Sequence, residues 1–303
     1  MAAARRGGPI LTCDLAGMGL GSDDIELATV GLHRLRRGAY LLAKPDDRLE
    51  LHRQLARSAA MQHPGNPVIS HLSAAVLHGF AVEEDHLNWV HLTLAAARGG
   101  RRNGIHTHLA DLPPAEVSIV DGIAVTSPRR TVIDSARMLP LVEAVVIADQ
   151  ALSQKLVELP DLIADAAALG RRAGGRAARH AMSLADPGGQ SPAETRIRLI
   201  LVQAGFEVDT QVEISDSNGK FIGRVDMKLR NSPVVVEFDG RVKYGLNGDV
   251  EVAHWKEKLR HDELGDAGHP AVRVIWNHLA RPEGILRRVH AAVARAERLG
   301  LTG

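Results

Sequence analysis

The stretch GRVDMKLRNSPVVVEFDGRVKYG, residues 223–245, decides how the last third of the chain folds. Two apolar runs flank a short polar break, which predicts a β-hairpin. Each run carries a carboxylate among its apolar residues, Asp226 in the first and Glu237 in the second. If Asn231 and Ser232 form a two-residue turn, counting outward along both strands places Asp226 directly opposite Glu237.

The two facing acids have two interpretations. Directly opposed side chains on one face of a sheet have Cβ atoms roughly 4.5–5.5 Å apart, so like charges there repel. Either a cation lies between them, since hard oxygen ligands suit Mg²⁺ or Mn²⁺, or both acids point to solvent and bond neighbours such as Arg224. A bound ion would polarise a phosphodiester, and Lys243, just past the second strand, would stabilise the developing charge.

The order of elements predicts an α/β chain, α+β overall, of two or three domains. We expect a winged helix-turn-helix over residues 1–60, a mixed α/β region over 61–187 and an αβββαβ domain over 188–303. The linker between the last two is ADPGGQSPAE, residues 185–194, which combines Pro, Gly and Ser. In the last domain, helices are expected over 191–204, near 250–265 and from 282, and strands over 208–214, 221–229, 233–239 and 271–276. In the middle region we expect one helix over 68–80 with Ser70 as a candidate cap, and short strands near 87–95, 104–110 and 122–127. Helices are expected from 127, with a break at Pro140.

The composition narrows the class of protein. A hydrophobic share of 45% and a charged share of 24% are ordinary for a soluble globular protein. The net charge of +1 does not by itself indicate a nucleic-acid binder. The single cysteine, Cys13, excludes an internal disulfide and a cysteine-based zinc cluster, and it favours a reducing cytoplasm. No sustained apolar run follows the N-terminus, so neither a signal peptide nor a membrane span is expected.

Four segments of the last domain, SPAE, RVDMKL, VVVEFDGRVK and EKLRHDEL, occur in that order within residues 190–285. Together they resemble the restriction-endonuclease-like superfamily, whose active site is written PD-(D/E)XK, and within it the very-short-patch-repair-like domains. The resemblance implies a metal-dependent phosphodiesterase. Position by position it implies these site residues: the helix acid Glu194, the strand acid Asp226, the pair Glu237 and Asp239, Lys243 in place of the family's histidine, and the helix arginine Arg260.

The chain departs from the superfamily at one position. The superfamily's lysine stands two residues after the second acid, where this chain has Asp239. Lys243 or Lys258 would therefore have to reach the site from elsewhere. A nuclease-like sheet that has lost its catalysis remains an alternative.

The first segment, residues 10–42, predicts two helices and then a Gly-centred β-ribbon, with Ser22 expected to cap the second helix. With VISHLSAAVLHGF and VTSPRRTVIDSAR behind it, the segment resembles the AbiEi-type antitoxins of type IV toxin–antitoxin systems over about residues 1–185. That resemblance implies a winged domain that binds promoter DNA and a later part that counters a nucleotidyltransferase toxin.

The charges in this segment favour the ribbon over the helix as a DNA contact. The second helix carries Asp23, Asp24 and Glu26, which would repel phosphate. The candidate DNA-binding residues are those of the ribbon: Arg34, Arg36, Arg37 and Tyr40. A winged fold used for protein contacts is the alternative.

The histidines show no recognised zinc spacing. His71 and His78 are seven apart on one expected helix, and His106 and His108 alternate on one expected strand. We therefore expect local hydrogen bonds there and assign no metal. The sequence thus favours a cytoplasmic, DNA-directed protein with a Mg²⁺-dependent or Mn²⁺-dependent endonuclease-like domain, and the alternative is a non-catalytic antitoxin-like regulator.

Overall fold

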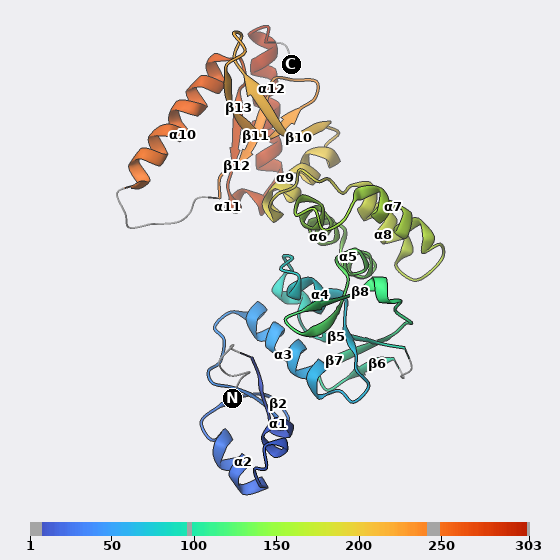
Figure 1. The fold of residues 1–303 in the computed structure, drawn as a ribbon. Coiled ribbons are helices and arrows are strands. Elements are labelled where there is room, and N and C mark those ends of the chain that lie inside the picture. The colour runs from blue at the N-terminus through green and yellow to red at the C-terminus, as the bar shows by residue number, and fades with distance from the viewer. Residues whose placement is uncertain (1–7, 96–98, 241–248, 302–303) are drawn as a thin grey trace. The chain divides into compact units, whose positions relative to one another are not determined.

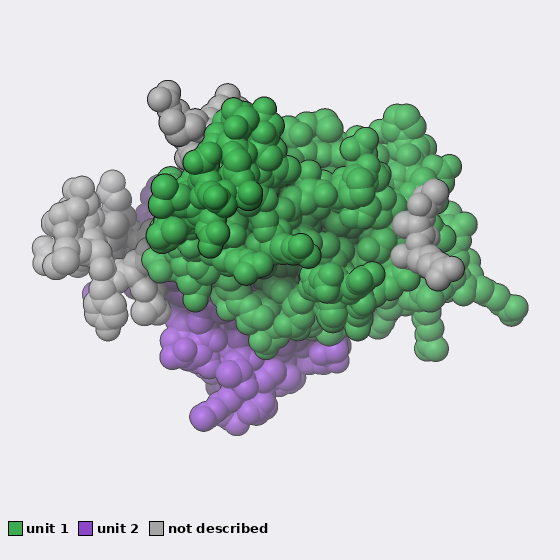
Figure 2. All heavy atoms as spheres, turned by 90° about the horizontal axis from the view of Figure 1, so that it is seen from below, with its two compact units in different colours: residues 1–183 green, residues 184–303 purple. Residues whose placement is uncertain are grey.

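The computed structural model describes residues 8–95, 99–240 and 249–301, with the backbone alone described over 249–257. The chain forms two compact units, Met1–Ser183 and Leu184–Gly303, which Figure 2 draws in separate colours. The boundary lies just before the linker that the sequence predicts, and the expected boundary at residue 60 lies inside the first unit. Helices make up 46% of the chain and strands 21%, which confirms a mixed α/β protein.

The first unit opens with two short helices and a three-stranded antiparallel sheet of order β1-β3-β2 (Figure 1). Its elements are β1 (Ile10–Leu11), α1 (Thr12–Gly17), α2 (Ser22–Thr29), β2 (His33–Arg36) and β3 (Ala39–Leu41). The order of two helices followed by a ribbon is the expected one. Ser22 is not the cap of α2, because Gly21 occupies that position and its N–H donates to Asp24 Oδ2 at 3.2 Å.

A mixed six-stranded sheet of order β6-β7-β5-β4-β9-β8 forms the centre of the first unit. Its strands are β4 (Val68–Ile69), β5 (Val90–Leu94), β6 (Gly100–Arg102), β7 (Ile105–Leu109), β8 (Val117–Val120) and β9 (Ile123–Thr126). The expected helix over 68–80 is shorter, because Ile69 pairs with both Leu92 and Val125 in the middle of the sheet. The remaining elements before β8 are α3 (Arg48–Gln62), α4 (His71–Leu77), and the 3₁₀ turns Glu84–His86 and Pro114–Glu116.

Four helices complete the first unit: α5 (Pro128–Ala136), α6 (Leu141–Ser153), α7 (Leu159–Ala168) and α8 (Gly175–Ser183). The expected break at Pro140 is confirmed, since Pro140 is the N-cap residue of α6. Ser127 caps α5 by accepting a hydrogen bond from the Arg130 N–H. Pro128 occupies the first turn, where its missing N–H removes no helical bond.

The second unit is a four-stranded sheet of order β10-β11-β12-β13 between helices. Its elements are α9 (Pro192–Gln203), β10 (Val208–Ser215), β11 (Phe221–Leu229), β12 (Val235–Phe238), α10 (Asp249–Asp266), β13 (Ala271–Val274), α11 (Trp276–Leu279) and α12 (Pro282–Arg298). Apart from the short α11, this is the α-β-β-β-α-β-α order read from the sequence. β12 and β13 pair in parallel, and the other two pairings are antiparallel.

Helices cover both faces of this sheet (Figure 1). On one face Met227 and Val236 pack with Ile197 of α9 and Ile285 of α12. On the other face Val235 packs with Leu264 of α10. Within the described part of the chain, no helix combines the length and the apolar character needed to cross a membrane.

Candidate functional site

The β11–β12 hairpin has the register that the sequence predicts. Met227 pairs with Val236 and Lys228 with Val235, so the same register places Asp226 across from Glu237. Arg224, on β11, was the expected partner of the two acids. It is exposed and lies opposite Glu213 of β10, so it does not take that role. The interpretation in which both acids point to solvent does not describe Glu237, which is 7% exposed.

Asp226 lies where the β11–β12 ladder ends. Its Oδ2 accepts a hydrogen bond of 2.7 Å from the backbone N–H of Phe238. The β11–β12 pairing provides no carbonyl for the Phe238 N–H, so the Asp226 carboxylate accepts its hydrogen bond instead. The pKa of Asp226 is raised to about 6, chiefly by burial and also by the Glu194 and Glu237 charges, against the Phe238 N–H and the Arg260 charge, which lower it.

Glu237 is held by a partly buried ion pair with Arg260 of α10. Arg260 Nη2 donates to Glu237 Oε1 at 2.8 Å. Gly223 on β11 makes room for this arginine, because a Cβ at Gly223 would lie 3.1 Å from Arg260 Cδ. The second oxygen of Glu237, Oε2, is buried and accepts no hydrogen bond from the described residues.

Glu194 is fixed by the start of α9. Its Oε1 accepts from the Ser191 hydroxyl at 2.7 Å, and Ser191 Oγ in turn accepts from the Glu194 N–H at 3.2 Å. This is the reciprocal capping expected of Ser and Glu three residues apart. Its Oε2 accepts from the Gln190 N–H and from Gln211 Nε2, at 3.1 and 3.2 Å.

Gln211 is the site residue that sequence reasoning missed. It lies on β10 with φ of 53°, in the left-handed region that residues other than glycine rarely adopt. The β10–β11 register would place it opposite Asp226, yet this pair is absent from the described ladder. Its side chain instead bonds Glu194 and the Gly188 carbonyl, so it ties the linker to α9.

The remaining predicted site residues lie at or beyond the edge of this cluster. Asp239 is half-buried and its N–H donates to the Val274 carbonyl at 2.8 Å, which extends the pairing of β12 with β13. Lys258 is exposed on α10, two residues before Arg260. Lys243 lies outside the described residues.

The four central side chains suit a hard cation. Glu194, Asp226, Glu237 and Arg260 comprise three carboxylates and one guanidinium, a net charge of −2 when all are ionised. A buried anionic oxygen without a donor, such as Glu237 Oε2, is unfavourable unless a cation approaches it. Carboxylate oxygens are the ligands that Mg²⁺ and Mn²⁺ prefer. By its chemistry the donor set suits such an ion, and Asp226 and Glu237 are the residues that could hold it.

The candidate DNA-binding residues do gather on the β2–β3 ribbon. Arg34 lies opposite Tyr40, and Arg36 opposite Ala39. Arg34 and Arg37 are exposed. Arg36 is half-buried, and burial lowers the pKa of its guanidinium. α2 beside them buries none of its residues, so its acidic side chains face solvent.

The motif VTSPRRTVIDSAR forms a salt-bridged corner of the first unit. A pocket of about 520 Å³ lies here, lined by residues of α5 and α7. Arg130 and Arg137 both pair with the buried Asp134, and Arg129 pairs with Asp165. All three arginines of the motif form ion pairs with neighbouring acids, so the motif has a structural role in this corner.

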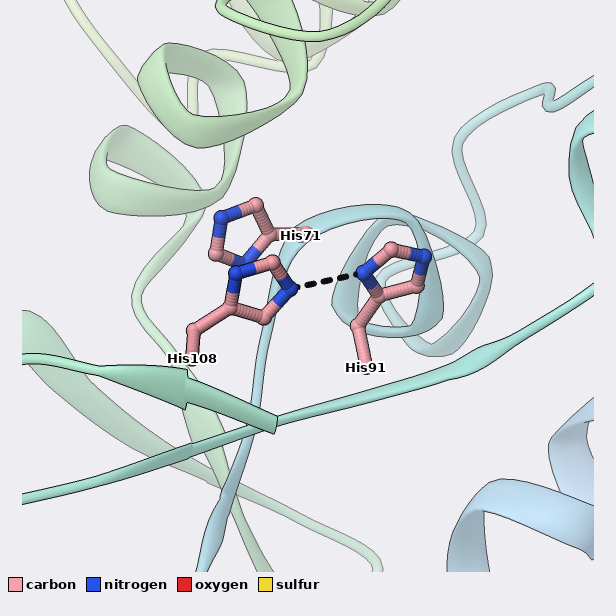
Figure 3. Close-up of side chains that lie close together, drawn as sticks. All are labelled: His71, His91 and His108. Atoms are coloured by element: carbon pink, nitrogen blue, oxygen red, sulfur yellow. Dashed lines mark hydrogen bonds between the residues drawn. The ribbon is translucent and has the colours of Figure 1, made fainter. Parts of the chain in front are cut away.

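Histidines from three separate elements also converge, although their spacing gave no zinc motif. His71, His91 and His108 each place a ring nitrogen within 4.8 Å of those of the other two (Figure 3). Among the described residues this is the one group of three such ligand atoms at that separation, so the three carboxylates of the second unit are less closely gathered.

The comparisons with known proteins give relatives without an assigned activity. No family model matches the chain. It is 26% identical over 275 residues to the uncharacterised proteins MT2308 and Rv2248 of two Mycobacterium tuberculosis strains. The alignment covers 90% of this chain and 94% of each relative, so the similarity extends through both units.

Proposed function

We propose that the second unit hydrolyses phosphodiester bonds in DNA with the help of Mg²⁺ or Mn²⁺, in the cytoplasm. The observation that carries the proposal is the buried Oε2 of Glu237, which accepts no hydrogen bond from the described residues, on a residue that the strand register places across from Asp226. Asp226 and Glu237 would hold the ion. When bound, the ion would supply positive charge to the phosphate at which the bond breaks.

Three further side chains, Arg260, Glu194 and Lys243, would position the metal-binding carboxylates and stabilise the developing charge. Arg260 holds Oε1 of Glu237 and leaves Oε2 to the ion. Glu194 accepts three hydrogen bonds and is therefore a positioning residue, whose charge keeps the pKa of Asp226 raised. Lys243 would supply the cation that stabilises the developing charge.

The test is a cleavage assay with the full chain and matched variants. Wild-type protein with Mg²⁺ or Mn²⁺ should nick or cut DNA, offered as supercoiled plasmid and as single-stranded, duplex and mismatched oligonucleotides. Glu237→Gln keeps the shape of the side chain but removes its charge, and it should lower the rate by on the order of a hundredfold or more. The control Glu213→Gln makes the same change at an exposed position on β10 and should cut like wild type.

The alternative is a non-catalytic, antitoxin-like DNA-binding regulator, with a nucleotidyltransferase-type toxin as its partner. The observation that favours it is the ribbon of the first unit, where exposed arginines lie beside Tyr40. If wild type and Glu237→Gln are equally inert on every substrate, the nuclease proposal fails. Salt-dependent binding of the same inert protein to duplex DNA would then support the regulator.

A further inference from the structure

The histidine cluster of the first unit is built from parts of the chain that are distant in sequence. His71 begins α4, His91 lies on β5 and His108 on β7. His91 Nδ1 and His108 Nε2 are 2.9 Å apart, and the His71 ring stacks on the His108 ring with centroids 3.6 Å apart and planes at 15° (Figure 3). Two of the three are buried, at 8% exposure for His71 and 2% for His91.

The sheet explains why the rings meet. β5 and β7 are parallel neighbours, with His91 opposite His106 and Thr93 opposite His108. Because residues two apart on a strand share a face, His91 and His108 point to the same side of the sheet. His71 approaches that side from α4, with φ of 50° at the helix start. Left-handed backbone at a residue other than glycine is unfavourable and persists where the surroundings require it, most often at functional sites.

Hydroxyl groups orient the histidines from behind. The Ser70 hydroxyl lies 2.9 Å from His71 Nδ1 and also accepts from Thr93 Oγ1 at 2.8 Å. Ser73 Oγ accepts from the backbone N–H of His91 at 2.8 Å. Metal-binding histidines are commonly fixed by a partner on the ring nitrogen that does not bind the metal, which is the place that the Ser70 hydroxyl takes beside His71. The Ser73 bond fixes the backbone of His91 and not its ring.

A further polar atom beside the cluster has no hydrogen bond. His106 Nδ1 is buried and makes none with the described residues. The ring of His106 lies 4.1 Å from that of His108 and 5.2 Å from that of His91, measured between centroids. Buried polar atoms normally have partners, so an unpaired ring nitrogen here indicates that a polar occupant belongs at this place.

The three rings are neutral at physiological pH, which is the form that binds metals. Burial, and to a lesser degree the neighbouring histidines and arginines, lower the pKa of His91 to about 3 and that of His108 to about 4. Burial also lowers the pKa of His71 well below its usual value. A metal ion therefore displaces no proton from these rings when it binds at pH 7.

We propose that His71, His91 and His108 bind one divalent transition-metal ion of the zinc class. Three imidazole ligands suit Zn²⁺, Co²⁺, Ni²⁺ and Cu²⁺ and do not suit Mg²⁺, which prefers oxygen. Three protein ligands leave a coordination position open, as in zinc sites that act on a bound molecule. The site is distinct from the carboxylate cluster of the second unit in its residues, its ligand chemistry and its metal.

Cobalt(II) titration of the full chain tests the proposal, since Co²⁺ reports its coordination by visible absorption. Protein stripped with a chelator should bind one equivalent of Co²⁺ with the absorption of a four- or five-coordinate ion, and Zn²⁺ should displace it. His108→Gln should abolish this absorption. His180→Gln, which changes an exposed histidine of α8, should leave it unchanged and controls for the other histidines among the 15 in the chain.

Two further measurements keep a negative result interpretable. Circular dichroism of metal-free His108→Gln should match wild type, and if it does not, His71→Gln replaces it as the test variant. Ser70→Ala should keep the one-to-one stoichiometry but weaken Co²⁺ binding by about 10–100-fold, because Ser70 orients His71 and is not itself a ligand. Absence of the absorption at one equivalent, or equal binding by wild type and both ligand variants, would overturn the metal site.

Discussion

The two units each gather titratable side chains in a partly buried place, and burial acts on them in opposite directions. In the second unit it raises the pKa of Asp226, because a carboxylate loses its charge when it is protonated. In the first unit it lowers the pKa of His71, His91 and His108, because an imidazole loses its charge when it is deprotonated. Both shifts favour the neutral form.

The histidine cluster of the first unit and the acidic cluster of the second unit therefore differ in their net charge at pH 7. The imidazoles are already neutral, and two of them satisfy each other through the His91–His108 hydrogen bond. The carboxylates remain charged, and Arg260 compensates only part of their charge. The acidic cluster of Glu194, Asp226 and Glu237 thus carries negative charge that a bound cation would reduce, whereas the neutral histidine cluster carries no such charge.

The largest expected effect comes from removing the positive charge of Arg260, which forms an ion pair with Glu237 in the acidic cluster. Arg260→Met keeps the length of the side chain and leaves Glu237 buried without a partner, which should cost about 3 kcal/mol of unfolding free energy, the lower end for broken buried pairs. Urea unfolding of the full chain measures it. Mg²⁺ should restore part of the loss, because the ion takes over the compensation.

Arg224→Met is the matched control, since it removes an exposed arginine from β11. It should change the unfolding free energy by no more than about 0.5 kcal/mol. If Arg260→Met behaves like this control, the acidic cluster does not depend on compensation and the contrast between the units is lost.

Acid should destabilise the histidine cluster by a similar amount. The folded-state pKa of His91, about 3, is below the ordinary value of 6.5, so its contribution to stability is complete above pH 6.5 and is lost as the pH falls. Between pH 6.5 and pH 4 this imidazole alone should remove about 3 kcal/mol. Hydrogen exchange of the β5 amides in the full chain, corrected for intrinsic rates, measures the loss.

The β12 amides of the second unit are the internal reference for that experiment. They should not follow the same curve, because Asp226 contributes a slope of the opposite sign between pH 4 and pH 6. Equal loss of protection in both strands on acidification would mean that global unfolding, and not the local charge of the imidazoles, sets the pH dependence.

Local patterns predicted much of the acidic site. The two apolar runs and the assumed turn at 231–232 predicted the register that faces Asp226 with Glu237. The register is the expected one, although the observed turn bond joins the Ser232 N–H to the Leu229 carbonyl. The helix expected over 191–204 is observed as α9, and Ser191 and Glu194 make reciprocal capping bonds at its start. The resemblance implied Arg260, whose contact depends on how α10 crosses the sheet and follows from no local pattern.

The histidine cluster was missed for the same physical reason. Spacing showed His106 and His108 on one strand, but His91 joins them through the parallel pairing of β5 with β7, and the segment between those strands includes β6. His71 was placed on a helix over 68–80 with Ser70 as its candidate cap, and the helix does begin after Ser70 because Ile69 pairs in the sheet. Gln211 likewise gave no signal, because its left-handed backbone is set by contacts with Glu194 and Gly188.

The smallest expected effect is a gain in stability on replacing Asp226, and it is the effect that best separates the acidic cluster from the histidine cluster. Asp226→Asn keeps an oxygen that can accept from the Phe238 N–H and removes a charge that Glu194 and Glu237 repel. A pKa raised from 3.8 to about 6 means that the folded state binds the proton more tightly, so the stability from this group is full below pH 4 and is lost as the pH rises to 6. Since the side chain is only partly buried, we expect the variant to gain about 1–2 kcal/mol at pH 7 and nothing at pH 4.

Urea unfolding at both pH values measures this gain, and cleavage by the same preparation measures the loss of activity. A variant that is more stable at pH 7 yet inactive shows that the chain tolerates an unfavourable charge for the sake of a cation and its chemistry, as functional sites often do. His91→Gln in the first unit removes no charge at pH 7, so it should bring no gain. If Asp226→Asn is instead less stable at pH 7, the carboxylate is a structural cap for the Phe238 N–H, and the two clusters differ only in the sign of their pKa shifts.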